Sequence, residues 1–301
     1  MRIDELLATP GGPVFSFEFF PPKTAEGEAN LQRTLDDLVA LDPSFASVTY
    51  GAGGSTRERT IDITKQIKHQ YGVEAMAHLS CVGATREQLA GILDEIRGAG
   101  IGNVLALRGD PPHGETEWKP TPGGLRYSTE LIAFVAERYP ELAIGAAAFP
   151  EVHPEAADLQ ADLRFLREKV EVGASFLITQ LFFDNRLYFE FVEEARAAGI
   201  DVPIVPGIIP VTNVDQIKRF TQMCGASLPE ALQTTLEQRA DDPQAVLELG
   251  VAYATLQASD LLSRGAPGIH FYVLNKAPAA RAILGALKLQ RPWERSLAPA
   301  R

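Results

Sequence analysis

Residues 85–110 read T-R-E-Q-L-A-G-I-L-D-E-I-R-G-A-G-I-G-N-V-L-A-L-R-G-D and contain one helical pattern followed by one strand pattern. Thr85-x-x-Gln88 is a capping box, which is typical of a helix start, and Gly100 lies where this helix would end. The run N-V-L-A-L-R-G-D, residues 103–110, begins with the apolar residues typical of a strand. The same alternation recurs along the chain, which indicates βα units around a parallel sheet.

Eight such strands can be counted. They are short runs rich in Val, Ile, Phe and Tyr, and they cover residues 14–20, 45–50, 74–81, 103–110, 143–150, 176–184, 204–210 and 268–275. A second capping box, Ser55-x-x-Glu58, and the helix-stopping residues Gly72 and Gly199 indicate that helices lie between the strands. Eight βα units predict a TIM (β/α)8 barrel as a single domain over residues 1–301, with an extra helix inserted between strands 7 and 8. An open doubly wound sheet is the alternative, and the eightfold count disfavours it.

The composition narrows the class of protein. Of 301 residues, 46% are hydrophobic and 22% charged, which fits a soluble globular protein, and the formal net charge is -11. This acidic balance argues against nucleic-acid or anionic-membrane partners, because both attract faces rich in Lys and Arg. We find no signal peptide and no membrane-spanning run. Cys81 and Cys224 form no C-x-x-C pair, so we expect neither a disulfide framework nor a zinc cluster, and a cytoplasmic location fits best.

The first strand pattern carries one carboxylate in an aromatic run, V-F-S-F-E-F-F-P-P-K, residues 14–23. Strand alternation places Glu18 on one side with Ser16 and Phe20, and places on the other side the three aromatic residues Phe15, Phe17 and Phe19. If these three pack under the helices, Glu18 points into the barrel mouth, where an apolar surround favours the protonated form and suits a general acid. The alternative is a structural ion pair with Lys or Arg.

Other candidate residues also follow strands, where TIM barrels build their active sites. Arg108 and Asp110 end the fourth strand; they are either site residues or simply an ion pair. The Pro/Gly-rich loop from Pro111 to Gly124 has the length and composition of a lid. Gln180 interrupts an apolar strand, and a ligand's polar edge is one way to satisfy its amide. No H-E-x-x-H or G-x-S-x-G motif occurs, so we expect no metal and no serine hydrolase chemistry.

These residues lie in motifs that resemble the methylenetetrahydrofolate reductase family. The resemblance covers nearly the whole chain, and its motifs follow the family's order: F-S-F-E-F-F-P-P-K-T, V-T-Y-G-A-G-G-S-T-R-E-R-T, A-H-L-S-C, A-L-R-G-D, P-E-V-H-P-E-A, I-T-Q-L-F-F-D, V-P-G-I-I-P and H-F-Y-V-L-N-K. It implies a TIM barrel of the short bacterial form without the regulatory domain of the eukaryotic one. It also implies that FAD accepts hydride from NADH or NADPH, which then leaves, and that 5,10-methylenetetrahydrofolate is reduced to 5-methyltetrahydrofolate for methionine synthesis.

The resemblance also implies roles for individual residues. Glu18 matches the family's catalytic acid, which protonates N10 of the folate, and Asp110 matches a carboxylate near the pterin and flavin. The residues that match substrate-binding positions are Gln180, Gln216, Phe220 and Lys276. Besides Asp110, the positions that match FAD contacts are Thr49, Tyr50, Ala52, His78, Arg108, Gly109, Tyr127, Ser128, His153, Asp162 and Lys169.

Three positions depart from the pattern. Lys276 stands where the enterobacterial form has Arg, so the folate tail would meet a point charge rather than a planar fork. Phe165 and Glu168 stand where the family has polar and basic residues, which would leave Lys169 to hold much of the FAD phosphate charge. The resemblance further implies a homo-oligomer. The alternatives are a non-catalytic folate- or flavin-binding relative, and another TIM-barrel enzyme that acts on a phosphorylated ligand.

Overall fold

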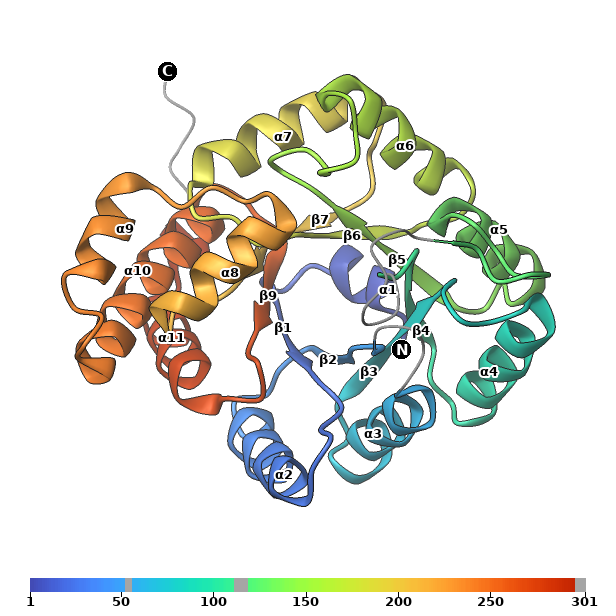
Figure 1. Ribbon diagram of the computed structural model, residues 1–301, viewed down its shortest axis with the longest axis horizontal. Helices are drawn as coiled ribbons and strands as arrows, with labels where there is room; N and C mark the ends of the chain where they lie inside the picture. The colour runs from blue at the N-terminus through green and yellow to red at the C-terminus, as the bar shows by residue number, and fades with distance from the viewer. Residues whose placement is uncertain (52–55, 111–118, 296–301) are drawn as a thin grey trace.

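The computed structural model describes residues 1–51, 56–110 and 119–295. They form a barrel of parallel strands inside a ring of helices (Figure 1). The strands are β1 Val14–Phe19, β2 Phe45–Val48, β3 Glu74–Ser80, β4 Asn103–Leu107, β5 Ala143–Ala148, β6 Phe176–Thr179, β7 Ile204–Val205, β8 Gly207–Ile208 and β9 Gly268–Tyr272.

The sheet closes through one short segment, residues 204–208. Its first half, β7, pairs with β6, and its second half, β8, pairs with β9, which in turn pairs with β1. Pro206 separates the halves, because proline has no N–H to donate to a ladder. The predicted seventh strand is therefore one extended segment with two short pairings, and the barrel of eight such segments is confirmed against the open sheet.

The two faces of β1 differ as the alternation predicted. Phe15, Phe17 and Phe19 are buried in the main core beneath the helices, together with leucines of α2 such as Leu31 and Leu35. On the inner face, Val14 lies in a second apolar cluster inside the barrel with Phe45, Met76 and Phe176. Ser16 and Glu18 follow Val14 on this inner face, so β1 carries polar groups up the barrel interior.

Helices cover the outside of the barrel. They are α2 Ala25–Val39, α3 Arg57–Gln70, α4 Arg86–Gly98, α5 Ser128–Arg138, α6 Leu159–Glu171, α7 Asn185–Ala197, α8 Val214–Cys224, α9 Glu230–Glu237, α10 Pro243–Ser263 and α11 Ala277–Gln290, followed by the short helix η2 Pro292–Arg295. The predicted insertion before the last strand is present, and it is larger than one helix. Three helices, α8 to α10, lie between β8 and β9, whereas a simple βα unit has one.

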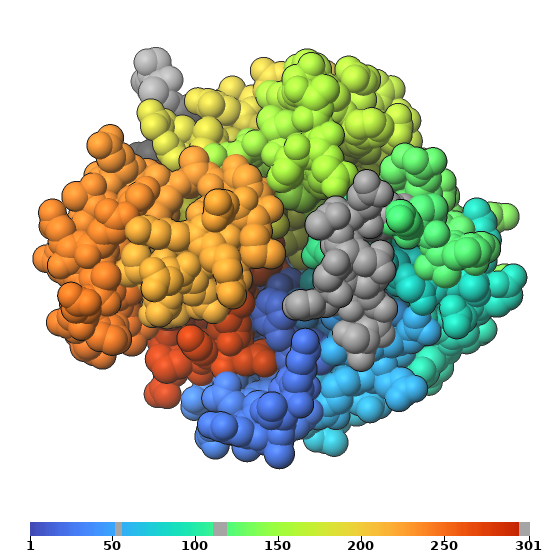
Figure 2. Space-filling view, viewed as in Figure 1, coloured from blue at the N-terminus to red at the C-terminus, as the bar shows by residue number. Residues whose placement is uncertain are grey.

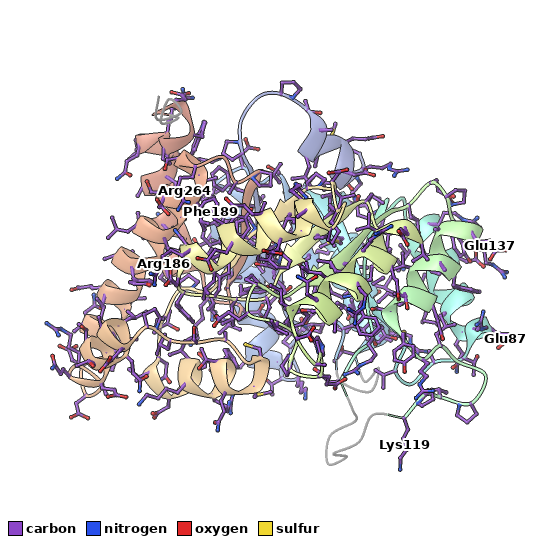
Figure 3. All side chains as sticks on the ribbon, turned by 90° about the horizontal axis from the view of Figure 1, so that it is seen from above. Glu87, Lys119, Glu137, Arg186, Phe189 and Arg264 are labelled. Atoms are coloured by element: carbon purple, nitrogen blue, oxygen red, sulfur yellow. The ribbon has the colours of Figure 1, made fainter. Side chains whose placement is uncertain are left out.

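A helix that was not predicted from the sequence, α1 Ile3–Ala8, closes the end of the barrel opposite α8 (Figure 3). Ile3 is fully buried in the inner apolar cluster. Its backbone N–H donates to Asn103 Oδ1 over 2.7 Å, which satisfies one of the free donors of the helix N-terminus. Within the three described ranges, the helices lack the combination of length and apolar character needed to span a membrane.

The predicted element ends are partly wrong. β4 ends at Leu107 and β6 at Thr179, earlier than the predicted residues 110 and 184, because the residues that follow leave the ladder and form the loops at the barrel mouth. The capping box of Thr85 and Gln88 is confirmed, with hydrogen bonds of 3.3 and 2.9 Å in the two directions. The predicted box at Ser55 lies outside the described residues.

Candidate active site

The carboxyl ends of the strands surround a cavity of about 420 Å³. Seven of the residues singled out from the sequence line it: Glu18, Thr49, Tyr50, His78, Asp110, Gln180 and Phe220. They come from the ends of five strands and from α8, which lies over one side of the barrel mouth (Figures 1 and 2). Most of the remaining wall is aliphatic or aromatic, so the cavity combines an apolar body with a few polar groups, as ligand sites usually do.

Glu18 lies at the inner end of this cavity and is 6% exposed. Its Oε2 is 3.4 Å from His78 Nε2 on β3 and 3.4 Å from His270 Nε2 on β9. His270 Nδ1 is in turn 2.8 Å from Ser16 Oγ. Among the described residues, the basic side chains within 4 Å of the Glu18 carboxyl group are thus two histidines. The predicted alternative, a Lys or Arg partner, is wrong.

The two histidines beside Glu18, His78 and His270, are both buried but differ in their hydrogen bonds. Burial lowers the pKa of His78 to about 4, although the nearby Glu18 carboxylate raises it. His78 is therefore neutral at pH 7, and its buried Nε2 makes no regular hydrogen bond to the described protein atoms. His270 is fully buried, and its ring lies edge-on to Tyr272 at 5.3 Å. Oε2 of Glu18 thus faces one imidazole nitrogen from β3 and one from β9.

Aromatic and amide side chains form other parts of the wall. Tyr272 donates to Thr179 O over 2.7 Å, and burial raises its pKa well above the usual value. Gln180 directly follows β6, and its Oε1 accepts from Leu181 N–H over 2.9 Å, which leaves the amide NH2 of Gln180 for another partner. Phe220 reaches the cavity from α8, with the Arg219 guanidinium 5.7 Å from its ring.

The turn after β4 brings Asp110 into the cavity. Gly109 makes this turn with φ +87°, and a Cβ there would lie 2.7 Å from a methyl group of Val82, so both conformation and space require glycine. Arg108 forms a two-pronged ion pair with Glu155 over 2.5 and 2.7 Å. Glu155 was not predicted as a partner, because 47 residues separate the two.

Beside the cavity, a polar group that we call the rim cluster consists of Arg108, His153, Glu155, Asp162 and Lys169. Asp162 Oδ2 accepts from His153 N–H over 2.8 Å, and His153 Nδ1 accepts from Glu155 N–H over 3.1 Å. Lys169 Nζ donates to the carbonyl of Ala147 over 3.0 Å, and burial lowers its pKa. Since Ala147 lines the cavity, the cation of Lys169 lies directly behind the wall.

The other predicted residues lie outside the cavity lining. Tyr127 caps α5, with Ser128 as its first residue, and the carbonyl of Tyr127 accepts from Cys81 Sγ over 3.4 Å. Gln216 lies one helical turn before Phe220 on α8. Lys276 caps α11 and borders a neighbouring cavity of about 430 Å³. Phe165 is 54% exposed on α6, four residues before Lys169.

Two predictions for the site, in addition to the box at Ser55, fall on undescribed segments. Ala52 lies outside the described residues, and so do residues 111–118, most of the predicted lid. The described end of that loop is fixed near the start of α4, where Arg86 N–H donates to the Gly123 carbonyl over 3.1 Å. Lys119, which follows the undescribed part, lies at the same end of the molecule as α8 (Figure 3).

His270, Ser16 and Tyr272 were not predicted as members of the site. A signal for them was present, because alternation in G-I-H-F-Y places His270 and Tyr272 on one face of the last strand. Since the last strand of a closed barrel pairs with the first, this face adjoins Glu18.

Comparison with known proteins places these features in a family. The family model described as "Methylenetetrahydrofolate reductase" matches residues 2–288. The 5,10-methylenetetrahydrofolate reductase of Salmonella typhimurium is 40% identical over 286 residues, with 95% of this chain and 94% of that protein covered. "Methylenetetrahydrofolate reductase (NADH) 1" of Arabidopsis thaliana is 38% identical over 95% of this chain, which spans about half (51%) of that plant relative.

A solved structure supports the fold. A Clostridium thermocellum protein, described as binding two copies of 5-methyl-5,6,7,8-tetrahydrofolic acid, superposes with a TM-score of 0.61 at 14% identity, and covers 95% of this chain and 98% of its own. At this identity the likeness concerns the fold alone. The family match and the bacterial relative extend over nearly the whole sequence, so the chain belongs to the methylenetetrahydrofolate reductase family.

Proposed function

We propose that this protein reduces 5,10-methylenetetrahydrofolate to 5-methyltetrahydrofolate, with NADH or NADPH as the electron donor and FAD as the cofactor. One observation carries the proposal: in a chain of this family, a buried carboxyl group, Glu18, lies at the inner end of an apolar cavity between two imidazoles. The reaction needs one hydride and one proton, and in this proposal Glu18 gives the proton.

Glu18 acts as the general acid at N10 of the folate, so that the five-membered ring opens to an iminium ion ready to accept hydride. Its position favours this role, because Glu18 lines the cavity although it is only 6% exposed, so its carboxyl group can reach a bound ligand while bulk water is largely excluded. Nε2 of His270 contacts Oε2 of Glu18, and the hydrogen bond between Ser16 Oγ and His270 Nδ1 fixes the orientation of the His270 ring. Asp110, across the cavity, supplies negative charge where the iminium develops.

The rim cluster and the apolar wall fit FAD. Arg108 and Lys169 provide cationic donors for a diphosphate, and Lys169 uses one of its three donors on the Ala147 carbonyl. Thr49, Tyr50 and His78 would border the flavin ring in the cavity. When bound, FAD supplies the hydride that reduces the folate. Gln180 and Phe220 would hold the folate, Gln180 by amide donors that have no hydrogen-bond partner within residues 1–51, 56–110 and 119–295, and Phe220 by stacking.

The proposal is tested with the purified protein. Flavin absorbance in the visible, either as isolated or after FAD is added, should accompany a steady oxidation of NADH or NADPH that depends on methylenetetrahydrofolate. Chromatography should identify 5-methyltetrahydrofolate as the product. A protein that stays colourless with added FAD and forms no methyltetrahydrofolate would contradict the proposal. The rates with the two nicotinamides, measured side by side, identify the preferred donor.

A further inference from the structure

The loop after β9 contains an unusual backbone corner at Leu274 and Asn275. Both residues have left-handed backbone conformations, with φ of 50° and 53°. Residues other than glycine rarely adopt this region, and a bulky residue such as leucine is sterically strained there. Such strain persists only where the surroundings hold the chain firmly, and it tends to lie at functional positions.

Asn275 is what holds this corner. Its Oδ1 accepts from Phe20 N–H over 2.9 Å, and its Nδ2 donates to the Phe20 carbonyl over 2.8 Å. Its own carbonyl accepts from Asn30 Nδ2 over 2.7 Å and from Thr34 Oγ1 over 2.9 Å. One residue therefore joins the end of β1, helix α2 and the loop after β9 by four hydrogen bonds.

The side chain of Asn275 continues the ladder between β1 and β9. The regular pairing of these strands ends at Glu18 and Tyr272. Beyond it, the Asn275 amide takes the place of a backbone peptide group and satisfies both the N–H and the carbonyl of Phe20. On the side of β9, this one side chain thus holds the segment that follows Glu18, while β2 pairs with Phe19 on the other side.

Two of the residues held in this way line the candidate active site. Phe20 and Leu274 both border the 420 Å³ cavity with Glu18. The next residue, Lys276, borders the neighbouring cavity and caps α11. A change at Asn275 would therefore move part of the cavity wall without removing any group from the cavity lining.

We propose that Asn275 is a positioning residue, which acts through Phe20 and Leu274 to shape the folate-binding wall of the cavity. This inference rests on the proposed function for its ligand. It predicts that losing the clamp weakens folate binding more than it slows the chemical steps, because Glu18 and the cofactor contacts stay in place.

The test compares Asn275→Gly with a matched control, Asp42→Gly. Glycine relieves the left-handed conformation at both positions, since Asp42 has φ 51°, but Asp42 lies before β2, at the end of the barrel away from the cavity. For Asn275→Gly we expect the KM for methylenetetrahydrofolate to rise about tenfold, within the range for altered contacts in a hydrophobic pocket. The rate of flavin reduction by the nicotinamide should stay within about twofold of wild type, and Asp42→Gly should match wild type in both.

A second variant and a second measurement separate a loss of the clamp from a failure to fold. Asn275→Asp tolerates the same backbone but replaces the donor to the Phe20 carbonyl by a carboxylate oxygen, which this carbonyl repels. Its KM for methylenetetrahydrofolate should therefore also rise above that of wild type, and it replaces the glycine variant if the latter does not fold. Hydrogen exchange at the Phe20 amide should be faster in Asn275→Gly than in Asp42→Gly, because glycine removes the Oδ1 that accepts from Phe20 N–H, whereas Asn275→Asp keeps this acceptor. If KM and Phe20 exchange are unchanged, the inference is overturned. If wild type itself fails to reduce folate, the proposed function fails, and the exchange rates alone decide whether Asn275 is the clamp.

Discussion

Acidification should destabilise the barrel through His78. Burial lowers the pKa of His78 to about 4 in the folded chain, whereas in the unfolded chain it titrates near 6.5. Above pH 6.5 the imidazole is neutral in both states. As the pH falls from 6.5 towards 4, the unfolded state binds a proton that the folded state does not. His78 should therefore lower the free energy of unfolding by about 2 kcal/mol between pH 7 and 5, and by about 3 kcal/mol at pH 4.

The measurement is urea denaturation of the protein without added cofactor at pH 7, 6 and 5, for wild type and for His78→Gln. All other groups titrate in both proteins, so the difference between their pH dependences isolates His78. A second variant, His69→Gln, is the matched control, because His69 is exposed on α3. It should keep the wild-type pH dependence. If His78→Gln loses stability on acidification as steeply as wild type does, the buried neutral state assigned to His78 is wrong.

Three further substitutions test separate parts of the structure. Gln180→Glu should lower folate turnover at least about tenfold, the worth of one hydrogen bond, and leave the flavin spectrum unchanged; equal kinetics in both half-reactions would make Gln180 a structural amide. Ile3→Ala should lower the free energy of unfolding by about 2–5 kcal/mol, because the shortened side chain would leave a void at the end of the barrel that α1 closes. A loss well below this range in urea titrations would show that the Ile3 side chain contributes little to the packing there. Gly207→Ala should cost about 1–3 kcal/mol by crowding the Tyr272 ring and the Thr179 carbonyl, and an unchanged melting temperature would refute that crowding.

The barrel could be predicted because its signals are local. The capping box at Thr85, the stop at Gly100 and the apolar run after it fix one helix and one strand within 26 residues, and the repetition of that unit leaves few architectures. The orientation of Glu18 also followed from alternation with its aromatic neighbours. Both inferences depend on periodicity, a pattern to which every residue of a segment contributes.

The partners inside the site could not be predicted in this way, because they are far apart in the chain. His270 reaches Glu18 across 252 residues, and Glu155 reaches Arg108 across 47. The helix α1 was missed because six residues are too few for a clear helical period. The division of residues 204–208 into two pairings depends on which neighbours the closed barrel provides, and this is a property of the whole sheet.

The most direct test of the central claim is rapid mixing of the Glu18→Gln variant with each substrate in turn. Bleaching of the flavin by NADH or NADPH needs no proton on folate, whereas recolouring by methylenetetrahydrofolate does. General acid catalysis contributes about 10²- to 10⁴-fold, so recolouring should slow by at least about 100-fold while bleaching changes little. Glu137→Gln, a surface variant on α5 (Figure 3), should leave both rates at the wild-type values. Equal slowing of both half-reactions, or unchanged recolouring, would show that Glu18 is not the acid.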